Sequence, residues 1–431
     1  MVVFTIASIL SGLSQNIQQL IYARMMQGIG GALLVPGSLS IINISFDEKI
    51  KGKAIGIWAG LTALTTALGP LIGAWLAEYY SWRLVFFMNI PIALIVLPVL
   101  LTKVQFKETL NKNKLDIVGS FLISLGLGLI IYGLIESSNL SFTNPIVISS
   151  ILLGIIMVSG FIYYENKIEN PILPLGIFKS LDFTISNIIT FIFWAAWNAA
   201  IFFLPLTFIQ VFGYRVDQFA VGFIPTYVAL IIFAPISGFL VNRLGIKLPL
   251  ILGNLIIGLS YYLYTLADLD AKYINDFLLP ITLMGAGVGL TISPLVSAVF
   301  GSAGRSNSGL ISGINNSIGR VAGLFAIAMM GVVAINYFNY EFFMSISEFN
   351  IEKTLKEVLD NEKINMGAMT IPNWVTPELK SKLETAVRLS FLKSFRIIMY
   401  ICSCLAFICS ILTLFALNQN KILIDDKEIN S

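Results

Sequence analysis

An arginine lies inside a long apolar run near the start of the sequence. Arg24 is followed at helical spacing by Gln27, Gly28 and Gly30. A charged side chain inside a membrane is costly and almost always lines a cavity, has a partner or serves a function. Glycines about one turn apart let a second helix approach closely. The spacing predicts a helix that carries a functional cation, and the alternative is an arginine with a purely structural role.

A second group of residues combines glycine with proline. Gly56 precedes Gly69, Pro70 and Gly73 within the apolar residues 54–78. Proline removes a helical hydrogen bond and bends the helix, while glycine permits close packing of a neighbouring helix. The pattern predicts a bent, tightly packed helix crossing. Such a crossing either has a functional role or serves packing alone.

Aromatic and amide side chains form a third group. Phe191, Trp194, Trp197 and Asn198 fall in one apolar run, and Asn315 falls in a later one. Flat aromatic faces suit hydrophobic or cationic compounds, because cation–π attraction contributes about 0.5–2 kcal/mol. These five residues are the candidates for a substrate cavity. The alternative is an aromatic patch that faces lipid or packs helices together.

The composition indicates where these residues act. The chain has 431 residues, of which 57% are hydrophobic and 12% charged, with a mean hydropathy of +0.85. Soluble domains carry about 25% charged residues, so we expect an integral membrane protein with the lipid bilayer as a partner. The net charge is only +3 and no Lys/Arg-rich run occurs. The sequence therefore argues against nucleic acid as a partner.

Missing residue types argue against several functions. The sequence contains no histidine, which is the commonest metal ligand and a frequent general base. Together with the lack of a carboxylate pair at hydrolase spacing, this predicts no enzyme activity, no metal site and no cofactor. The phosphate-binding motif G-x-x-x-x-G-K-[ST] is also missing, so uphill transport would use an ion gradient. Gly285, Gly287 and Gly289 lie in an apolar run and predict helix packing rather than dinucleotide binding.

The apolar runs predict an all-α, polytopic membrane protein with eleven full spans and one partial span. The first thirteen residues are too short to cross a bilayer, so we expect them to be part of a span rather than a signal peptide. The full spans are predicted at 17–45, 54–78, 83–102, 117–136, 145–164, 183–211, 219–241, 248–267, 277–298, 309–336 and 397–417.

Charge in the connecting loops predicts the orientation. Fourteen Lys and Arg residues lie in one set of alternate loops and three in the short loops of the other set, so the first set is cytoplasmic and the C-terminus lies inside. Residues 337–396 would then form an extracytoplasmic insertion. Helical spacing around Ile351–Leu359 and Pro377–Phe391 predicts amphipathic helices there. Whether a periplasmic adaptor binds this insertion is open.

The motifs resemble a known family. The run from Leu20 to Ala32 around Arg24 resembles the fourth-span motif of the drug:proton antiporters of the major facilitator superfamily. That resemblance implies that Arg24, with Gln27, Gly28 and Gly30, assists proton transfer. Gly56 and the run Gly69-Pro70-Leu-Ile-Gly73 resemble the antiporter motif of the fifth span. Thr65 and Ala74 depart from that motif but are small.

Further segments resemble the fourteen-span branch of this superfamily in the same order. They include the stretch from Leu115-Asp116 to Gly119, the stretch from Pro171 to Phe178, and the residues around Arg320. A segment from Gly238 to Lys247 resembles the second copy of the family's cytoplasmic signature loop. It implies a conformational loop formed by Gly238, Arg243, Gly245 and Lys247.

The resemblance implies helical bundles that rock about a central cavity. It implies proton-coupled efflux of hydrophobic or cationic drugs across the cytoplasmic membrane of a bacterium, with a small-molecule substrate and the proton gradient as partners. Two spans of the family pattern are not matched. The implied domains are the remnant of a first bundle at 1–103, two additional spans at 104–182, a second bundle at 183–418 and a cytoplasmic tail at 419–431.

Three alternatives stay open. The chain could be a non-transporting remnant or a helix-packing partner, since no carboxylate lies in the middle of a predicted span. A small-solute uptake permease is disfavoured by the Gly69-Pro70 motif. A membrane enzyme is disfavoured because no span carries a nucleophile with a base.

Overall fold

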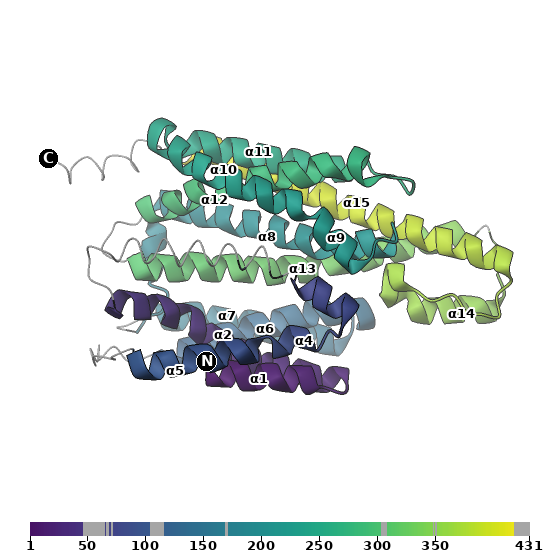
Figure 1. Cartoon of the computed structure of the whole chain (residues 1–431), viewed down its shortest axis with the longest axis horizontal. Coiled ribbons are helices and arrows are strands. Elements are labelled where there is room, and N and C mark those ends of the chain that lie inside the picture. The colour runs from purple at the N-terminus through teal and green to yellow at the C-terminus, as the bar shows by residue number, and fades with distance from the viewer. Residues whose placement is uncertain are drawn as a thin grey trace. The chain divides into compact units, whose positions relative to one another are not determined.

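The computed structural model is built from helices that form two compact units (Figure 1). One unit comprises Met1–Lys112 with Arg215–Val221, and the other comprises Asn113–Tyr214 with Gly222–Ser431. Within the described part of the chain there is no strand, which confirms the all-α prediction. The structure describes residues 1–45, 65, 69, 72–103, 116–168, 171–302, 308–347, 349 and 351–417.

Nine helical segments in the described residues are long and apolar enough to cross a membrane. Each overlaps a predicted span, and most of the predicted span 54–78 lies outside the described residues. The shorter helix α1 (Val2–Leu13) has 12 residues. The nine are Leu84–Thr102, Ile117–Ser137, Pro145–Glu165, Leu181–Gln210, Val216–Val241, Lys247–Tyr264, Tyr273–Gly301, Leu310–Ile346 and Pro377–Ala416.

The first unit packs around α1. This helix contacts α2 (Ile17–Ser45), α4 (Leu84–Phe87) and α5 (Asn89–Lys103). The buried Ser8 hydroxyl donates to the Phe86 carbonyl over 2.8 Å, and Asn89 Nδ2 donates to Ser8 Oγ over 2.9 Å. Hydrogen bonds of this kind join helices where lipid offers no partner.

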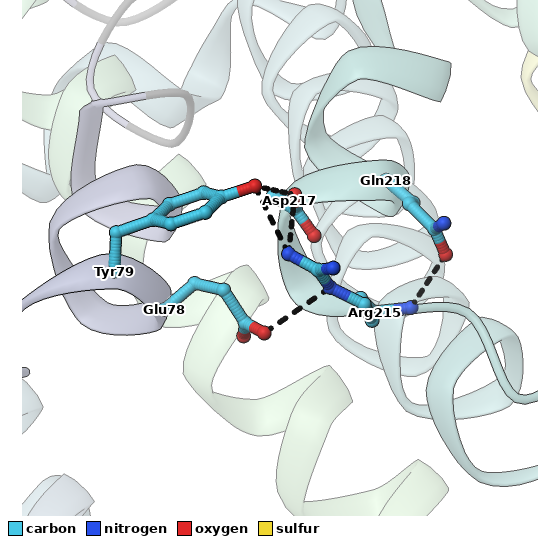
Figure 2. Close-up of polar contacts among 5 residues, drawn as sticks. All are labelled: Glu78, Tyr79, Arg215, Asp217 and Gln218. Carbon is cyan, nitrogen blue, oxygen red and sulfur yellow. Dashed lines mark hydrogen bonds and ion pairs between the residues drawn. The ribbon is translucent and has the colours of Figure 1, made fainter.

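A polar network holds the start of α9 (Val216–Gly222) in this first unit (Figure 2). Arg215 Nε lies 3.2 Å from Glu78 Oε1, and Arg215 Nη2 lies 3.0 Å from Asp217 Oδ2. The Tyr79 hydroxyl donates to Asp217 Oδ2 over 2.8 Å and accepts from Arg215 Nη2 over 3.0 Å. The bond to Tyr79 and the charge of Asp217 raise the pKa of Arg215, so the guanidinium stays charged.

The second unit begins with a helix hairpin, α6 (Ile117–Leu140) and α7 (Pro145–Glu165). Asn144 caps α7 by accepting from the Ile146 amide over 2.9 Å, and Pro145 occupies the first helical position, which its fixed φ favours. The two helices cross closely at glycines. A Cβ on Gly154 would lie 2.7 Å from the Gly126 carbonyl oxygen.

Six long helices follow in the described part of the second unit. They are α8 (Leu181–Gln210), α10 (Ile224–Leu244), α11 (Lys247–Tyr264), α12 (Leu278–Gly301), α13 (Ser308–Ile346) and α15 (Pro377–Ala416). A Cβ on Gly285 of α12 would overlap the Thr226 carbonyl of α10, and one on Gly287 would lie 2.8 Å from the Gly253 carbonyl oxygen of α11. These contacts confirm the predicted packing role of the glycine series.

Buried hydroxyl groups link the same helices through backbone carbonyls. Each bond joins two different helices and satisfies a polar side chain away from water. The bonds are Thr226 Oγ1 to Ile281 O at 2.9 Å, Ser237 Oγ to Leu290 O at 2.7 Å, Ser260 Oγ to Pro280 O at 2.7 Å and Ser403 Oγ to Gly258 O at 2.7 Å.

The insertion extends two of these helices (Figure 1). Helix α13 runs on to Ile346 and α15 already begins at Pro377, whereas the predicted spans ended at 336 and began at 397. The helical extensions carry polar residues that pair with each other, as in the 2.6 Å ion pair between Lys393 and Glu341. Between them lies α14 (Lys353–Glu362), which confirms the predicted short helix.

We expect Gly285→Ala to destabilise the second unit, because a Cβ there would overlap the Thr226 backbone. The expected loss is about 1–3 kcal/mol, as for other overpacked interiors. Gly331→Ala is the matched control, since Gly331 of α13 has open space around a Cβ. Thermal unfolding of the purified variants in one detergent measures the effect. Equal unfolding temperatures for the two variants would contradict the glycine-packing interpretation.

Arg215→Met is expected to loosen residues 215–221. The change removes the contacts of the guanidinium with Glu78, Tyr79 and Asp217 while keeping much of the apolar stem. Amide hydrogen exchange in this segment should become several-fold faster. The control Lys382→Met removes the exposed Lys382–Glu378 pair and should leave exchange at 215–221 unchanged. Unaltered exchange in Arg215→Met would show that the network does not hold α9.

Candidate functional site

A cavity opens between α8 and α13 within the second unit. Its volume is about 510 Å³, which falls in the range of roughly 300–1,000 Å³ typical of small-molecule sites. Two helices that are far apart in the sequence therefore form one concave surface. It is lined by Trp194, Asn198, Asn315, Asn316, Gly319, Arg320, Gly323, Leu324 and Ile327.

Two glycines of α13 set the position of two side chains of α8. A Cβ on Gly319 would lie 2.9 Å from Trp194 Cδ1, and one on Gly323 would lie 2.8 Å from Asn198 Cγ. Residues four apart lie on one face of a helix. Trp194 and Asn198 are four residues apart, and so are Gly319 and Gly323. The face of α8 that carries Trp194 and Asn198 therefore lies directly against the bare backbone of α13.

Three asparagines supply amide groups to the cavity wall. Asn198 Nδ2 donates to the Trp194 carbonyl over 2.8 Å, and Asn316 Nδ2 donates to the Ser312 carbonyl over 2.9 Å. Thr190 Oγ1 lies 2.9 Å from Asn315 Oδ1. Each amide thus has one polar atom bonded within the protein, and its other polar atom has no partner among the described residues.

Among the described residues of this lining, Arg320 alone is charged. Among the described residues it forms no ion pair and no hydrogen bond. It lies about twelve residues after the start of α13 at Ser308, which is ~18 Å along the helix. The guanidinium is therefore an unpaired cation deep within a segment long enough to span the membrane.

The predicted cavity residues are only partly brought together. Trp194, Asn198 and Asn315 line the same cavity. Phe191 does not line the cavity, and its ring centre lies 6.3 Å from the ring centre of Phe325. The half-buried Trp197 does not line the cavity either.

Asn316, a polar residue within a predicted span, also lines the cavity, and so does Arg320, which sequence reasoning did not assign to it. Both have a signal in the sequence, because each is a polar residue inside an apolar run. The sequence could not show that α8 and α13 are neighbours, which is what places these residues beside Trp194.

In the first unit, Arg24 has partners of its own. Its Nη1 donates to Gln27 Oε1 over 2.6 Å, and its Cζ lies 5.6 Å from the centre of the Phe86 ring. Gln27 is 4% exposed, so the amide is buried while the guanidinium is more accessible.

The two motif glycines beyond Gln27 have different surroundings. A Cβ on Gly30 would lie 2.6 Å from the Phe4 amide nitrogen, so this glycine allows α1 to pack closely on α2. Gly28 has open space around a Cβ. Close helix packing therefore explains Gly30 and gives no reason for Gly28.

The residues of the predicted antiporter motif are described only in part. Gly56 and Pro70 lie outside the described residues. Gly69 and Gly73 are helical, and a Cβ on either would meet no described atom within 4 Å. A tight crossing at these two glycines is therefore not seen among the described residues.

The predicted conformational loop forms the sharp connection between α10 and α11. Gly245 ends α10 with φ at 78°, a left-handed conformation that favours glycine. Arg243 lies over the Phe239 ring, with Cζ 4.5 Å from its centre. Lys247 begins α11 and donates to the Leu414 carbonyl over 3.2 Å. Gly238 lies inside α10, where a Cβ would be 3.6 Å from Ser293 Oγ.

The Leu115–Gly119 motif has a structural explanation. Asp116 caps α6, since its Oδ1 accepts from the Gly119 amide over 2.8 Å. Glu165, at the end of α7, accepts from the Leu173 amide over 3.0 Å. A Cβ on Gly119 would overlap the Asp116 carboxylate and lie 2.7 Å from Glu165 Oε1. Glycine is needed there so that both carboxylates fit, and the pair fixes the chain leading toward α8.

Known proteins similar to this chain are transporters. The chain is 28% identical to the Multidrug transporter protein MdtP of Bacillus subtilis, over 77% of this chain and 62% of that protein. It is 28% identical to the Multidrug resistance protein Stp of Mycobacterium tuberculosis, over 77% of this chain and 61% of that protein. It is 25% identical to the Uncharacterized MFS-type transporter YhcA of Bacillus subtilis, over 84% of this chain and 69% of that protein. The chain thus spans 61% to 69% of the length of these relatives.

A solved structure shares the fold. A bacterial homologue of the human lysosomal transporter Spinster, in an inward-facing and unoccupied conformation, matches with a TM-score of 0.56 over 96% of this chain and 82% of that one, at 17% identity. The family model described as Major Facilitator Superfamily matches residues 1–327. With the membrane-spanning helices described above, this match shows that the chain belongs to the major facilitator superfamily.

Proposed function

We propose that this protein exports small amphipathic molecules, drugs among them, across the cytoplasmic membrane of a bacterium by alternating access. The observation that carries the proposal is the α8–α13 cavity, which combines an aromatic face with amides and a cation deep in a membrane-spanning segment. Sites that bind amphipathic molecules have this mixed lining. The names of the relatives MdtP and Stp, which refer to multidrug transport and resistance, support export of drugs.

The direction and coupling of transport rest on the motif residues of α2. Among the described residues, Arg24 bonds to the amide side chain of Gln27 and to no carboxylate. A neutral amide can be exchanged for a charged partner at small electrostatic cost, whereas a buried ion pair would be costly to separate. The geometry therefore suits a cation that changes partners during a transport cycle, and we propose that the cycle is driven by the proton gradient.

The tight Gly245 connection supports the alternating-access part of the proposal. Lys247 ties the start of α11 to the Leu414 carbonyl near the end of α15. Helices α11 and α15 are thereby joined at one end as well as through the Ser403 and Ser410 hydroxyls. A bundle joined in this way moves as a body, which is what rocking of whole bundles requires.

Transport should depend on the proton gradient. In cells of a pump-deficient bacterial host, expression should lower the steady-state content of an amphipathic fluorescent dye. Collapse of the gradient with a protonophore should return the content to that of cells carrying the empty vector. A dye content that stays low after the collapse would contradict proton coupling, and a content never below the vector control would contradict export of that dye.

Arg24→Ala should lower the initial efflux rate about tenfold or more, which corresponds to ~1.4 kcal/mol or more. The reason is loss of the cation that Gln27 and Phe86 hold. Arg24→Lys keeps the charge and should retain part of the rate. Lys380→Ala, at an exposed contact with Asn373, is the control for loss of one positive charge. Efflux by Arg24→Ala equal to that of the control, at equal expression, would remove Arg24 from the proposed mechanism.

A further inference from the structure

We infer that the α8–α13 cavity selects organic anions: molecules with an apolar or aromatic body and one carboxylate-like or other negatively charged group. The inference deepens the proposed function by naming the substrate class of that cavity. Transport of such anions rests on the proposed function, whereas binding of an anion to the cavity can be measured separately.

The charge of the lining is the first argument. Arg320 is the only charged residue among the nine described residues that line the cavity. A cation at the centre of a membrane helix costs about 2.5–3.5 kcal/mol on insertion scales, and Arg320 has no partner among the described residues to offset that cost. A bound anion would supply the missing partner. A cationic ligand would instead add a second positive charge to the same space and be repelled.

Arg320 lies far from the start of its helix. It lies about twelve residues, or ~18 Å, from the start of α13. Long basic side chains relieve the cost of burial near helix ends by extending to the interface, but this distance exceeds the length of an arginine side chain. Its charge is therefore available to whatever occupies the cavity.

The hydrogen-bonding groups of the wall also suit an anion. Arg320 presents a planar fork of donors that matches a carboxylate. Thr190 Oγ1 lies 2.9 Å from both the Ser186 carbonyl oxygen and Asn315 Oδ1, so the hydroxyl engages one polar atom of the Asn315 amide. The indole N–H of Trp194 donates only and has no partner among the described residues. The donors of Arg320 and Trp194 thus lie in one cavity with no carboxylate beside them among the described lining residues.

The rest of the wall fits the body of such a molecule. Trp194 offers a flat face, and Leu324 and Ile327 continue the lining on α13. These two apolar residues lie one and two helical turns beyond Arg320, so charged and apolar contacts are separated along one helix. A molecule with its charge at one end and its apolar part at the other would satisfy both regions at once.

The test compares three probes that carry the same fluorophore. Dansylglycine is anionic, dansylamide is neutral and dansyl-ethylenediamine is cationic. Each is titrated against the full chain in nanodiscs of zwitterionic lipid, and binding is followed by dansyl fluorescence excited through tryptophan. We expect dansylglycine to bind tightest and dansyl-ethylenediamine weakest. Equal affinities, or tightest binding of the cation, would overturn the inference.

Variants at Arg320 separate charge from shape. Arg320→Ala should weaken dansylglycine binding about tenfold or more, and Arg320→Lys should restore part of that loss. Dansylamide binding should be the same in all variants, which also shows that the cavity is intact. Lys380→Ala is the control for charge and should bind all three probes as the original chain does. An unchanged affinity of Arg320→Ala for dansylglycine would overturn the assignment.

Two further measurements identify the source of the anion and distinguish this inference from the proposed function. If replacing zwitterionic lipid with phosphatidylglycerol abolishes dansylglycine binding at high salt, where repulsion of the probe by the bilayer surface is screened, an anionic lipid head group fills the cavity and the substrate assignment is wrong. If the probes bind as expected and cells show no efflux of any dye, the exporter proposal fails while the anion site stands. If cells export cationic dyes and no anionic ones, the exporter proposal stands and the anion inference fails.

Discussion

Close approach of helix backbones at positions without a Cβ is the constraint on which the second unit depends. In a bilayer, helices gain little from burying apolar side chains against each other, because lipid is equally apolar. What holds them is dense packing and hydrogen bonds between helices. Gly253 and Gly287 bring α11 and α12 together, and Gly285 brings α12 against α10 at Thr226. Only at such distances can the Ser237 and Ser260 hydroxyls reach carbonyls of α12.

The same constraint shapes the candidate site. Gly319 and Gly323 remove two side chains from α13 at the points where Trp194 and Asn198 of α8 would otherwise collide with it. The two helices can then approach while polar side chains beside the glycines remain on the cavity wall. Packing and binding are thus served by one face of α13: its glycines hold α8 close, and Asn315, Asn316 and Arg320 supply the polar groups.

The two arginines inside apolar runs have different environments. Arg24 bonds to Gln27 and lies near the Phe86 ring, so its charge is partly accommodated by its own unit. Arg320 has no such partner among the described residues, and it lines a cavity large enough for a small molecule. An arginine with a neutral partner suits a step within the protein, whereas one without a partner suits a ligand. From the sequence, both are simply cations in helices.

Composition and hydropathy alone establish that the chain lies in lipid and that it folds into helices. A charged fraction of 12% and repeated apolar runs leave lipid as the only environment for most side chains, and lipid requires helices because every backbone group must be satisfied within the segment. Hydropathy therefore predicted the helices at 145–164, 248–267 and 277–298 closely. It failed at the insertion, where polar residues continue α13 to Ile346 and begin α15 at Pro377. Hydropathy detects where a helix meets lipid and not where the helix ends.

Tertiary structure alone decided which residues meet. Trp194 and Arg320 are separated by more than a hundred residues, and local periodicity does not say which helices are neighbours or which face each one presents. Phe191 and Trp194 lie in the same run, three positions apart, yet only Trp194 lines the cavity, and Phe191 packs against the Phe325 ring instead. Charge, composition and helix formation are local properties that the sequence carries. The cavity arises from packing between distant helices, and only the folded chain specifies it.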